Sequence, residues 1–287
     1  MEKILELSPK DFPPLLKEIP DKPKKLYYRG TIPDWENNKF LAIVGSRKYS
    51  EYGKSACEKL ITGLNGYPII IVSGLALGID SIAHQNALTS GLKTIAIPGS
   101  GLNKEVLYPA SHVGLAEKII KNGGLLLSEF EPNLKAAPYT FPQRNRIMAG
   151  LSHATLVIEA EEISGTLITS KLATEYNRDV LTVPGSMFSS TSAGPHMLLK
   201  LGATPIRTSE DILEALHIET EEKNNESYLP ADCSPVELMI LQFLSEPREK
   251  EFLIEKMKLP INEINSLLSV MEIKGLIKES LGEIRRI

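Results

Sequence analysis

The chain has 287 residues, of which 42% are apolar and 24% charged, and these proportions exclude a predominantly disordered or collagen-like chain. Lys and Arg number 32 against 36 Asp and Glu, so the net charge of −4 excludes a protein that coats nucleic acid through bulk electrostatics and leaves only a local basic patch. Two cysteines cannot build a disulfide framework or a four-ligand zinc site, and no apolar run could cross a bilayer, so we expect a reduced, soluble, cytoplasmic protein without metal, cofactor or membrane association.

Residues 1–36 contain six prolines and no sustained hydrophobic period. We expect an extended N-terminal lead that packs on the domain that follows it.

Short apolar runs alternate with stretches of helical spacing from residue 37 onward. The runs cover residues 40–44, 69–72, 94–97, 125–127, 155–158 and 180–183. Buried strands separated by helices predict a mostly parallel sheet covered on both faces. Because crossovers in such sheets are right-handed, the fold class is α/β, an extended Rossmann-like, doubly wound domain over residues 37–218.

The last part of the chain has a different pattern. Residues 219–227 are polar and acidic, which favours a linker. Residues 228–287 then show three helical patterns, at 236–244, 249–257 and 261–274, followed by two short strand patterns at 276–279 and 283–287. Three helices and a hairpin predict a small C-terminal winged-helix domain.

Small residues follow nearly every predicted strand, as in Gly45-Ser46, Ser73-Gly74 and Pro98-Gly99. Ligands of open α/β sheets bind at the carboxyl ends of the strands, where helix N-termini favour anions. Phosphate groups are therefore the expected ligand. The sequence has neither a Gly-x-Gly-x-x-Gly after the first run nor a phosphate-binding loop of the Gly-x-x-x-x-Gly-Lys-Ser/Thr type, so the usual fingerprints of dinucleotide binding and nucleotide hydrolysis are missing.

Basic residues fall in stretches that lack carboxylates. Arg47 and Lys48 lie in the first, Lys171 lies in another, and a third holds the cations Lys135, Arg144 and Arg146. If several of them project at the strand ends, they form a local cationic groove on an acidic protein. Phe141, beside this cluster, either stacks on a base or anchors a loop.

Asp80 and His84 are four residues apart and share a helix face, which is compatible with a metal or acid–base pair. No second His or Cys cluster accompanies them. We therefore favour a structural interpretation in which Asp80 caps the helix.

The motifs closely resemble those of the DNA-processing protein A family, also called DprA or Smf. They include Ala42-Ile43-Val44-Gly45-Ser46-Arg47, the segment from Ser73-Gly74 to Ile79-Asp80 with His84, and Phe141-Pro142-Gln143-Arg144-Asn145-Arg146. The resemblance covers about residues 12–216 and continues in Ser164-Gly165-Thr166 and Pro184-Gly185.

The resemblance implies a protein without enzymatic activity that binds single-stranded DNA in a cationic pocket, forms a homodimer and helps to load a RecA-type recombinase in natural transformation. Its motifs imply DNA contacts from Gly45, Ser46, Arg47, Phe141, Arg144, Asn145 and Arg146, with Gly165 and Thr166 nearby, and the cationic groove adds Lys135 and Lys171 to the candidates. Two positions depart from the family pattern, because Ala110 and Pro138 stand where relatives often have basic residues.

Two alternatives remain at this stage. The first is a Rossmann-like nucleotide-processing enzyme akin to phosphoribohydrolases, with Glu129 or Glu159 as the catalytic carboxylate. The second is a sequence-specific regulator that reads duplex DNA through the winged helix. Residues 228–287 carry eight Lys and Arg against ten Asp and Glu, which disfavours DNA docking by this module.

Apolar residues from Met197 to Leu216 predict a dimer contact.

Overall fold

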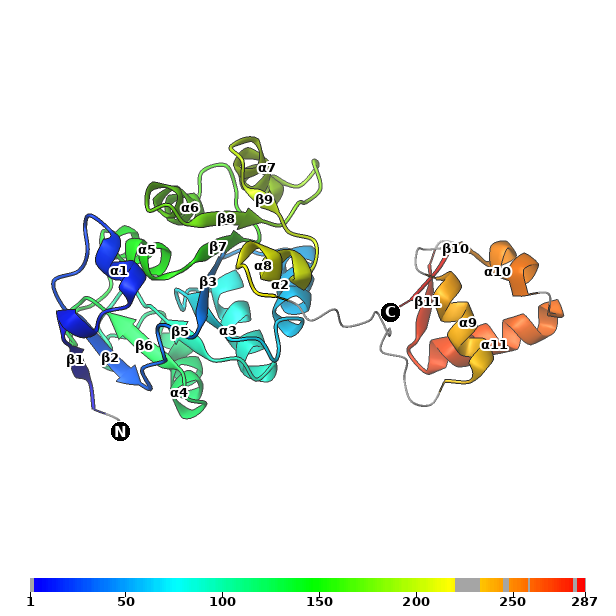
Figure 1. Ribbon diagram of the computed structural model, residues 1–287, viewed down its shortest axis with the longest axis horizontal. Helices are drawn as coiled ribbons and strands as arrows, with labels where there is room; N and C mark the ends of the chain where they lie inside the picture. Colours follow the sequence, from blue (N-terminus) through cyan, green and yellow to red (C-terminus); the bar gives the residue numbers. More distant parts are fainter. Residues whose placement is uncertain (1–2, 220–232, 245–247, 258, 281–282, 287) are drawn as a thin grey trace. The chain divides into compact units, whose positions relative to one another are not determined.

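The computed structural model describes residues 3–219, 233–244, 248–257, 259–280 and 283–286. The chain divides into two compact units, residues 1–220 and 221–287 (Figure 1). Among the described residues, no helix is long and apolar enough to cross a membrane. The expected acidic linker lies outside the described residues except for Glu219.

A nine-stranded sheet forms the centre of the first unit, in the order β1-β2-β6-β5-β4-β3-β7-β8-β9. Its six central strands are all parallel and coincide with the predicted apolar runs: β3 (Lys39–Val44), β4 (Ile69–Ser73), β5 (Thr94–Ala96), β6 (Leu125–Ser128), β7 (Ala154–Val157) and β8 (Asp179–Thr182). From β3 the chain builds outward to β6 and then returns to the other side of β3 as β7. This reversal confirms the doubly wound, Rossmann-like class.

Three short strands extend this sheet beyond the prediction. β2 (Leu26–Gly30) pairs antiparallel with β6, and β1 (Leu5–Leu7) pairs antiparallel with β2. At the opposite edge, β9 (Thr204–Pro205) is parallel to β8. The lead residues therefore supply one edge of the sheet.

Helices cover both faces of the sheet. One face carries α2 (Glu51–Thr62), α3 (Ile79–Thr89), α4 (Val113–Lys121) and α8 (Ser209–Ala215). The other carries α1 (Pro14–Glu18), α5 (Thr140–Leu151), α6 (Gly165–Glu175) and α7 (Ala193–Lys200). Strand β3 shows why both faces are filled: Leu41 and Ile43 join the first core, whereas Phe40 and Ala42 join the second.

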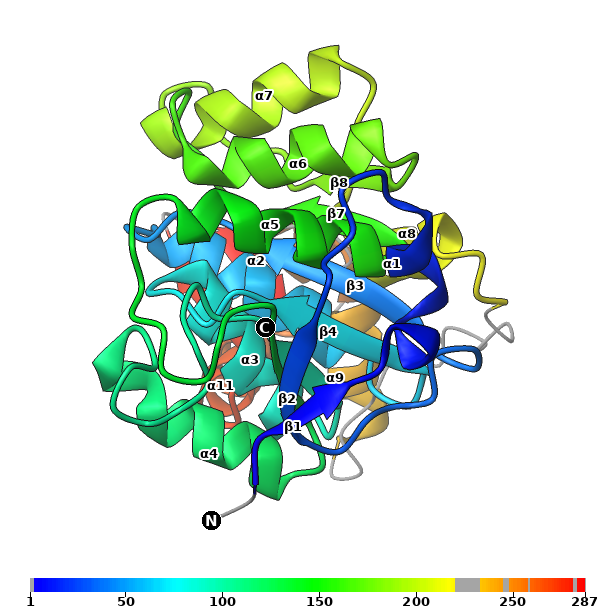
Figure 2. The same ribbon diagram turned by 90° about the vertical axis from the view of Figure 1, so that its left-hand side faces the viewer.

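Arginines tie the lead to the second face, where α1 lies beside α5 (Figure 2). Arg178 donates to the Leu15 carbonyl at 2.9 Å and to the Glu18 carboxylate at 2.8 Å. Arg146 on α5 donates to the carbonyl of Asp21 at 2.6 Å. These contacts fix the lead against the second face of the sheet, beside α5 and the start of β8.

The second unit contains α9 (Pro235–Phe243), α10 (Lys250–Met257) and α11 (Ile261–Ile273). A small antiparallel sheet accompanies them, with β10 (Arg248–Glu249), β12 (Glu283–Arg286) and β11 (Ile277–Ser280) in that order. Its own core includes Ile240, Leu253 and Ile264. This element content is compatible with the predicted winged helix.

Candidate functional site

A cavity of about 360 Å³ opens at the carboxyl ends of β3 and β7, where the direction of strand addition reverses. It is lined by the loop after β3, the start of α3, one side of α5 and the start of α6. The lining residues are Val44, Gly45, Ser46, Arg47, Lys48, Ala76, Asp80, Phe141, Arg144, Asn145, Met148, Glu161, Ile163, Ser164, Gly165, Thr166 and Thr169. A doubly wound sheet binds its ligands at this point.

Two glycines let the loops approach closely enough to form the cavity. Gly78, just before α3, has a φ of +82°, and a Cβ there would overlap the carbonyl of Ser46. A Cβ at Gly74 would overlap the guanidinium of Arg144. Both positions therefore exclude larger residues for steric reasons.

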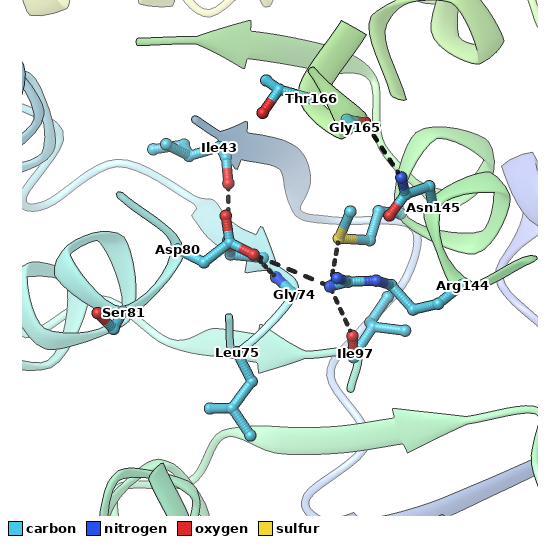
Figure 3. A network of polar contacts seen from close by, with 12 residues as sticks. Ile43, Gly74, Leu75, Asp80, Ser81, Ile97, Arg144, Asn145, Gly165 and Thr166 are labelled. Atoms are coloured by element: carbon cyan, nitrogen blue, oxygen red, sulfur yellow. Dashed lines mark hydrogen bonds and ion pairs between the residues drawn. The ribbon is translucent and has the colours of Figure 1, made fainter. Parts of the chain in front are cut away.

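The floor of the cavity holds a buried ion pair between Arg144 and Asp80 (Figure 3). The Nη1 of Arg144 lies 3.9 Å from Oδ2 of Asp80 and donates to the carbonyl of Ile97 at 2.9 Å. The same Asp80 oxygen accepts from the backbone N–H of Gly74 at 3.1 Å. Burial raises the pKa of Asp80, although Arg144 and the neighbouring N–H groups act in the opposite direction. Asp80 therefore anchors the floor, whereas we had expected it to cap α3.

His84 follows Asp80 by four residues on α3 and is fully buried. Its Nδ1 is 2.7 Å from Oγ1 of Thr94, which itself donates to the carbonyl of Ile71 at 2.8 Å. Thr94 thus accepts from Nδ1–H, and burial lowers the pKa of His84 to about 3. No group of three potential metal ligands occurs among the described residues. Both side chains make buried polar contacts, and a purely structural role for Asp80 and His84 stays a prediction.

The mouth of the cavity carries two exposed cations, Arg47 and Lys48, against one exposed carboxylate, Glu161, and its charge is therefore positive on balance. Arg47 and Lys48 are exposed, and neither makes an ion pair within the described residues. The guanidinium of Arg47 lies over the ring of Phe141, with its carbon 5.5 Å from the ring centroid. This cation–π contact holds Arg47 without neutralising its charge.

The start of α6 forms another wall of the cavity. The Ser164 hydroxyl caps the helix by accepting from the N–H of Thr166 at 3.2 Å. Thr166 donates in turn to the carbonyl of Gly45 at 3.2 Å, and Asn145 donates to the carbonyl of Gly165 at 3.4 Å. These bonds join the loops of β3 and β7, so that the positive end of the α6 dipole faces the cavity.

Three of the eleven candidate residues do not line this cavity. Arg146 is bound to Asp21 and Glu129 on the lead side of α5. Lys171 lies two helical turns into α6, where it pairs with Glu175 at 3.9 Å. Lys135 is exposed on the loop before α5. The remaining eight are brought together: Gly45, Ser46, Arg47, Phe141, Arg144, Asn145, Gly165 and Thr166.

Several lining residues were absent from the candidate set. Lys48 follows Arg47 in the same carboxylate-free stretch, and that signal could have included it. Asp80 was considered but not placed in the site, because its pairing with Arg144 spans distant parts of the chain. Glu161, Met148 and Thr169 had no signal that separated them from ordinary loop and helix residues.

The two carboxylates of the enzyme alternative are both occupied. Glu159 is buried and accepts from the Ser50 hydroxyl at 2.6 Å and from the Thr191 hydroxyl at 2.8 Å. Glu129 is bound to Arg146. Neither lines the cavity.

The fold and the cavity define a Rossmann-like protein with a cavity at its topological switch point, and three basic side chains, Arg47, Lys48 and Arg144, line that cavity. The family model described as DNA recombination-mediator protein A matches residues 3–217. The chain belongs to this family, and the resemblance found in the sequence is thereby confirmed.

Curated relatives and solved structures agree with the family assignment. The chain is 36% identical to protein Smf of Escherichia coli over 92% of this chain and 72% of the relative, and 43% identical to the DNA processing protein DprA of Streptococcus pneumoniae over 69% and 68%. The X-ray structure of the pneumococcal protein matches with a TM-score of 0.68 at 40% identity, covering 74% of each chain. The Helicobacter pylori DprA structure, described by its single-stranded DNA binding mode, matches with a TM-score of 0.67 at 29% identity, covering 76% of this chain and 98% of that one.

Proposed function

We propose that this protein binds single-stranded DNA in the switch-point cavity and acts in DNA processing during natural transformation and recombination. The observation that carries the proposal is the cationic mouth, where Arg47 and Lys48 are exposed without an ion pair in the described chain. A phosphate placed there meets two cations and the N-terminus of α6. The single-stranded DNA binding mode of the H. pylori relative supports this ligand.

The floor of the cavity adds specific support for an anionic ligand. The guanidinium of Arg144 is buried, and its Nε has no hydrogen-bond partner within the described residues. Asp80 compensates its charge only at 3.9 Å. Positive potential at the floor therefore adds to that of Arg47 at the mouth, while the buried carboxylate keeps Arg144 in place.

A binding role without catalysis is part of the proposal. Glu129 and Glu159 are held by hydrogen bonds to Arg146, Ser50 and Thr191, away from the cavity, so neither is free to act on a bound nucleotide.

Fluorescence anisotropy with a labelled single strand and its duplex, together with a chromatographic assay for hydrolysis of a nucleoside monophosphate, tests the proposed ligand and the absence of catalysis. We expect tight binding of the single strand, weaker binding of the duplex and no turnover of the monophosphate. Preference for the duplex, or hydrolysis of the monophosphate, would contradict the proposal.

A homodimer is also proposed, and an apolar groove of about 840 Å³ supports it. The groove runs between α6 and α7, and its rim exposes Ile163, Ile168, Met197 and Leu201. Ile163 is 95% exposed and Leu201 is 76% exposed, a large apolar area for a free surface. By contrast, Ile212 and Leu213 of α8 are buried in the core of their own unit, so α8 does not offer the apolar surface that we had expected of it.

Light scattering of the unaltered protein and of a Leu201→Glu variant tests this contact. We expect a dimer at micromolar concentration that the variant converts to monomer.

A RecA-type recombinase is proposed as the protein partner, with support from the name of the matched family. Pull-down with a purified recombinase in the presence of single-stranded DNA tests that interaction.

A further inference from the structure

An exposed aromatic ring lies beside Phe141 outside the cavity and belongs to Tyr108. Phe141 was expected either to stack on a base or to anchor a loop, and the structure surrounds its ring. Gly99 lies against one edge, so closely that a Cβ there would come within 2.6 Å of the ring. Arg47 lies over the ring, and Phe141 itself is only half-exposed. Little of its surface is left for a base.

Tyr108 continues the aromatic surface away from the cavity. Its ring centroid is 5.6 Å from that of Phe141, with an angle of 60° between the planes. Rings tilted in this way cannot sandwich a base between them. The Tyr108 side chain is 44% exposed, so one base can stack on its outer side while the neighbouring phosphate lies at Arg47.

The loop that carries Tyr108 is held firmly. The Tyr108 N–H donates to the Ser100 hydroxyl at 3.1 Å, and Leu107 beside it is buried. Four residues further on, Nδ1 of His112 lies 2.8 Å from the carbonyl of Leu75 in the loop after β4. An exposed aromatic ring on a fixed loop binds with little loss of conformational entropy.

We propose that Tyr108 is a base-stacking platform and that the single strand leaves the cavity across Arg47 and Phe141 toward Tyr108. Phe141 then acts as a positioning residue, which holds the Arg47 guanidinium and supports the Tyr108 ring. This inference rests on the proposed function and extends the site by one nucleotide along the carboxyl edge from β3 toward β5. Stacking on Tyr108 requires an unpaired base, so it also supplies a reason for preferring single strands over duplexes.

Affinity measurements on the full chain test the platform. For an oligothymidylate of about 15 nucleotides, Tyr108→Ala is expected to weaken binding by roughly fivefold to a hundredfold, whereas Tyr108→Phe retains affinity because stacking needs the ring and not the hydroxyl. The salt dependence of binding should not change in Tyr108→Ala, since no phosphate contact is lost. Tyr52→Ala is the matched control. Tyr52 is 53% exposed and does not line the cavity, and its hydroxyl donates to the Pro184 carbonyl.

An abasic scan of the oligonucleotide completes the test without altering the protein. One abasic position should weaken binding to the unaltered protein by the same factor as Tyr108→Ala, and it should have no further effect on that variant. If the unaltered protein binds the single strand but Tyr108→Ala binds equally well, the platform is refuted and the cavity proposal survives. If the unaltered protein binds no single strand, both fail. Should Tyr108→Ala not fold, the abasic scan decides alone: a uniform profile refutes the platform.

Discussion

Two regions of the first unit use arginine in opposite ways. At the lead, Arg178 binds Glu18 at 2.8 Å, and Arg29 binds Glu117 at 2.9 Å. At the mouth of the cavity, Arg47 meets an aromatic ring and no carboxylate within the described residues. Arginine charge that is neutralised inside the chain stabilises the fold, whereas charge that is left unpaired is available to a ligand.

Helix α5 places two arginines that are only two positions apart in different surroundings. Arg144 points into the cavity and Arg146 points to Asp21 and Glu129, because residues two apart lie on different faces of a helix. The sequence motif predicted the same DNA-binding role for both arginines, whereas the structure gives them different contacts.

Of the changes considered, Arg144→Ala should lower the free energy of unfolding most. It tests whether the paired arginine at the floor of the cavity stabilises the fold, in contrast to the unpaired Arg47 at the mouth. Removal of the guanidinium leaves the buried Asp80 carboxylate without its partner, and breaking such a pair costs about 3–5 kcal/mol. The unfolding free energy from urea titration should fall accordingly. The double variant Arg144→Met/Asp80→Asn should recover part of the loss, and equal loss in both variants would mean that the pair is not the cause.

Acid should destabilise the first unit through His84. The pKa of this buried imidazole is lowered from 6.5 to about 3, so between these values the unfolded chain binds more protons than the folded chain. Stability therefore falls as the pH falls below 6.5, by on the order of 2 kcal/mol at pH 5. Urea midpoints at pH 7 and pH 5 measure this, with His84→Gln as the control. An unchanged pH dependence in His84→Gln would assign the effect to other groups.

Arg146→Ala tests whether a paired arginine serves only the fold. Loss of its bonds to Asp21 and Glu129 should lower the unfolding free energy by roughly 1–2 kcal/mol. The affinity for single-stranded DNA should stay within twofold of the unaltered protein. A large loss of affinity in the folded variant would place Arg146 in the site after all.

Removing an arginine of the second unit should have the smallest effect on DNA binding. Because residues 228–287 carry a net charge of −2, the Arg285→Ala change should not alter duplex binding by the full chain in a gel shift at physiological salt. A duplex shift that disappears with Arg285→Ala would show that the second unit contacts DNA.

Sequence patterns were sufficient to predict the central sheet and the edge of the sheet at which the cavity opens. Six apolar runs marked β3 to β8, and small residues marked their carboxyl ends. Strands β1 and β9 were missed because two or three residues carry no measurable alternation, and β2 was missed because it lies in a proline-rich lead. At the site, the carboxylate-free stretches of the sequence indicated which basic residues to consider, but not the direction in which their side chains point.

Two features of the site depend on contacts that a sequence alone does not reveal. The pairing of Asp80 with Arg144 joins residues 64 positions apart, and it forms only when the loops of β4 and β5 meet α5. The side toward which Lys171 and Arg146 point depends on how α6 and α5 are rotated against the sheet. Core packing sets that rotation, and no single motif records it.

The central claim is that Arg47 is an unpaired phosphate ligand at the mouth of the cavity. The most direct test measures the affinity for a single strand over a range of salt concentrations, for the unaltered protein and for Arg47→Ala. The exposed Arg207, which pairs with Asp211, provides the control Arg207→Ala. The account predicts weaker binding for Arg47→Ala and a slope of log affinity against log salt that is less steep by about 0.7 for each lost phosphate contact, with no change in the control. Unchanged affinity and slope in a folded Arg47→Ala protein would contradict it.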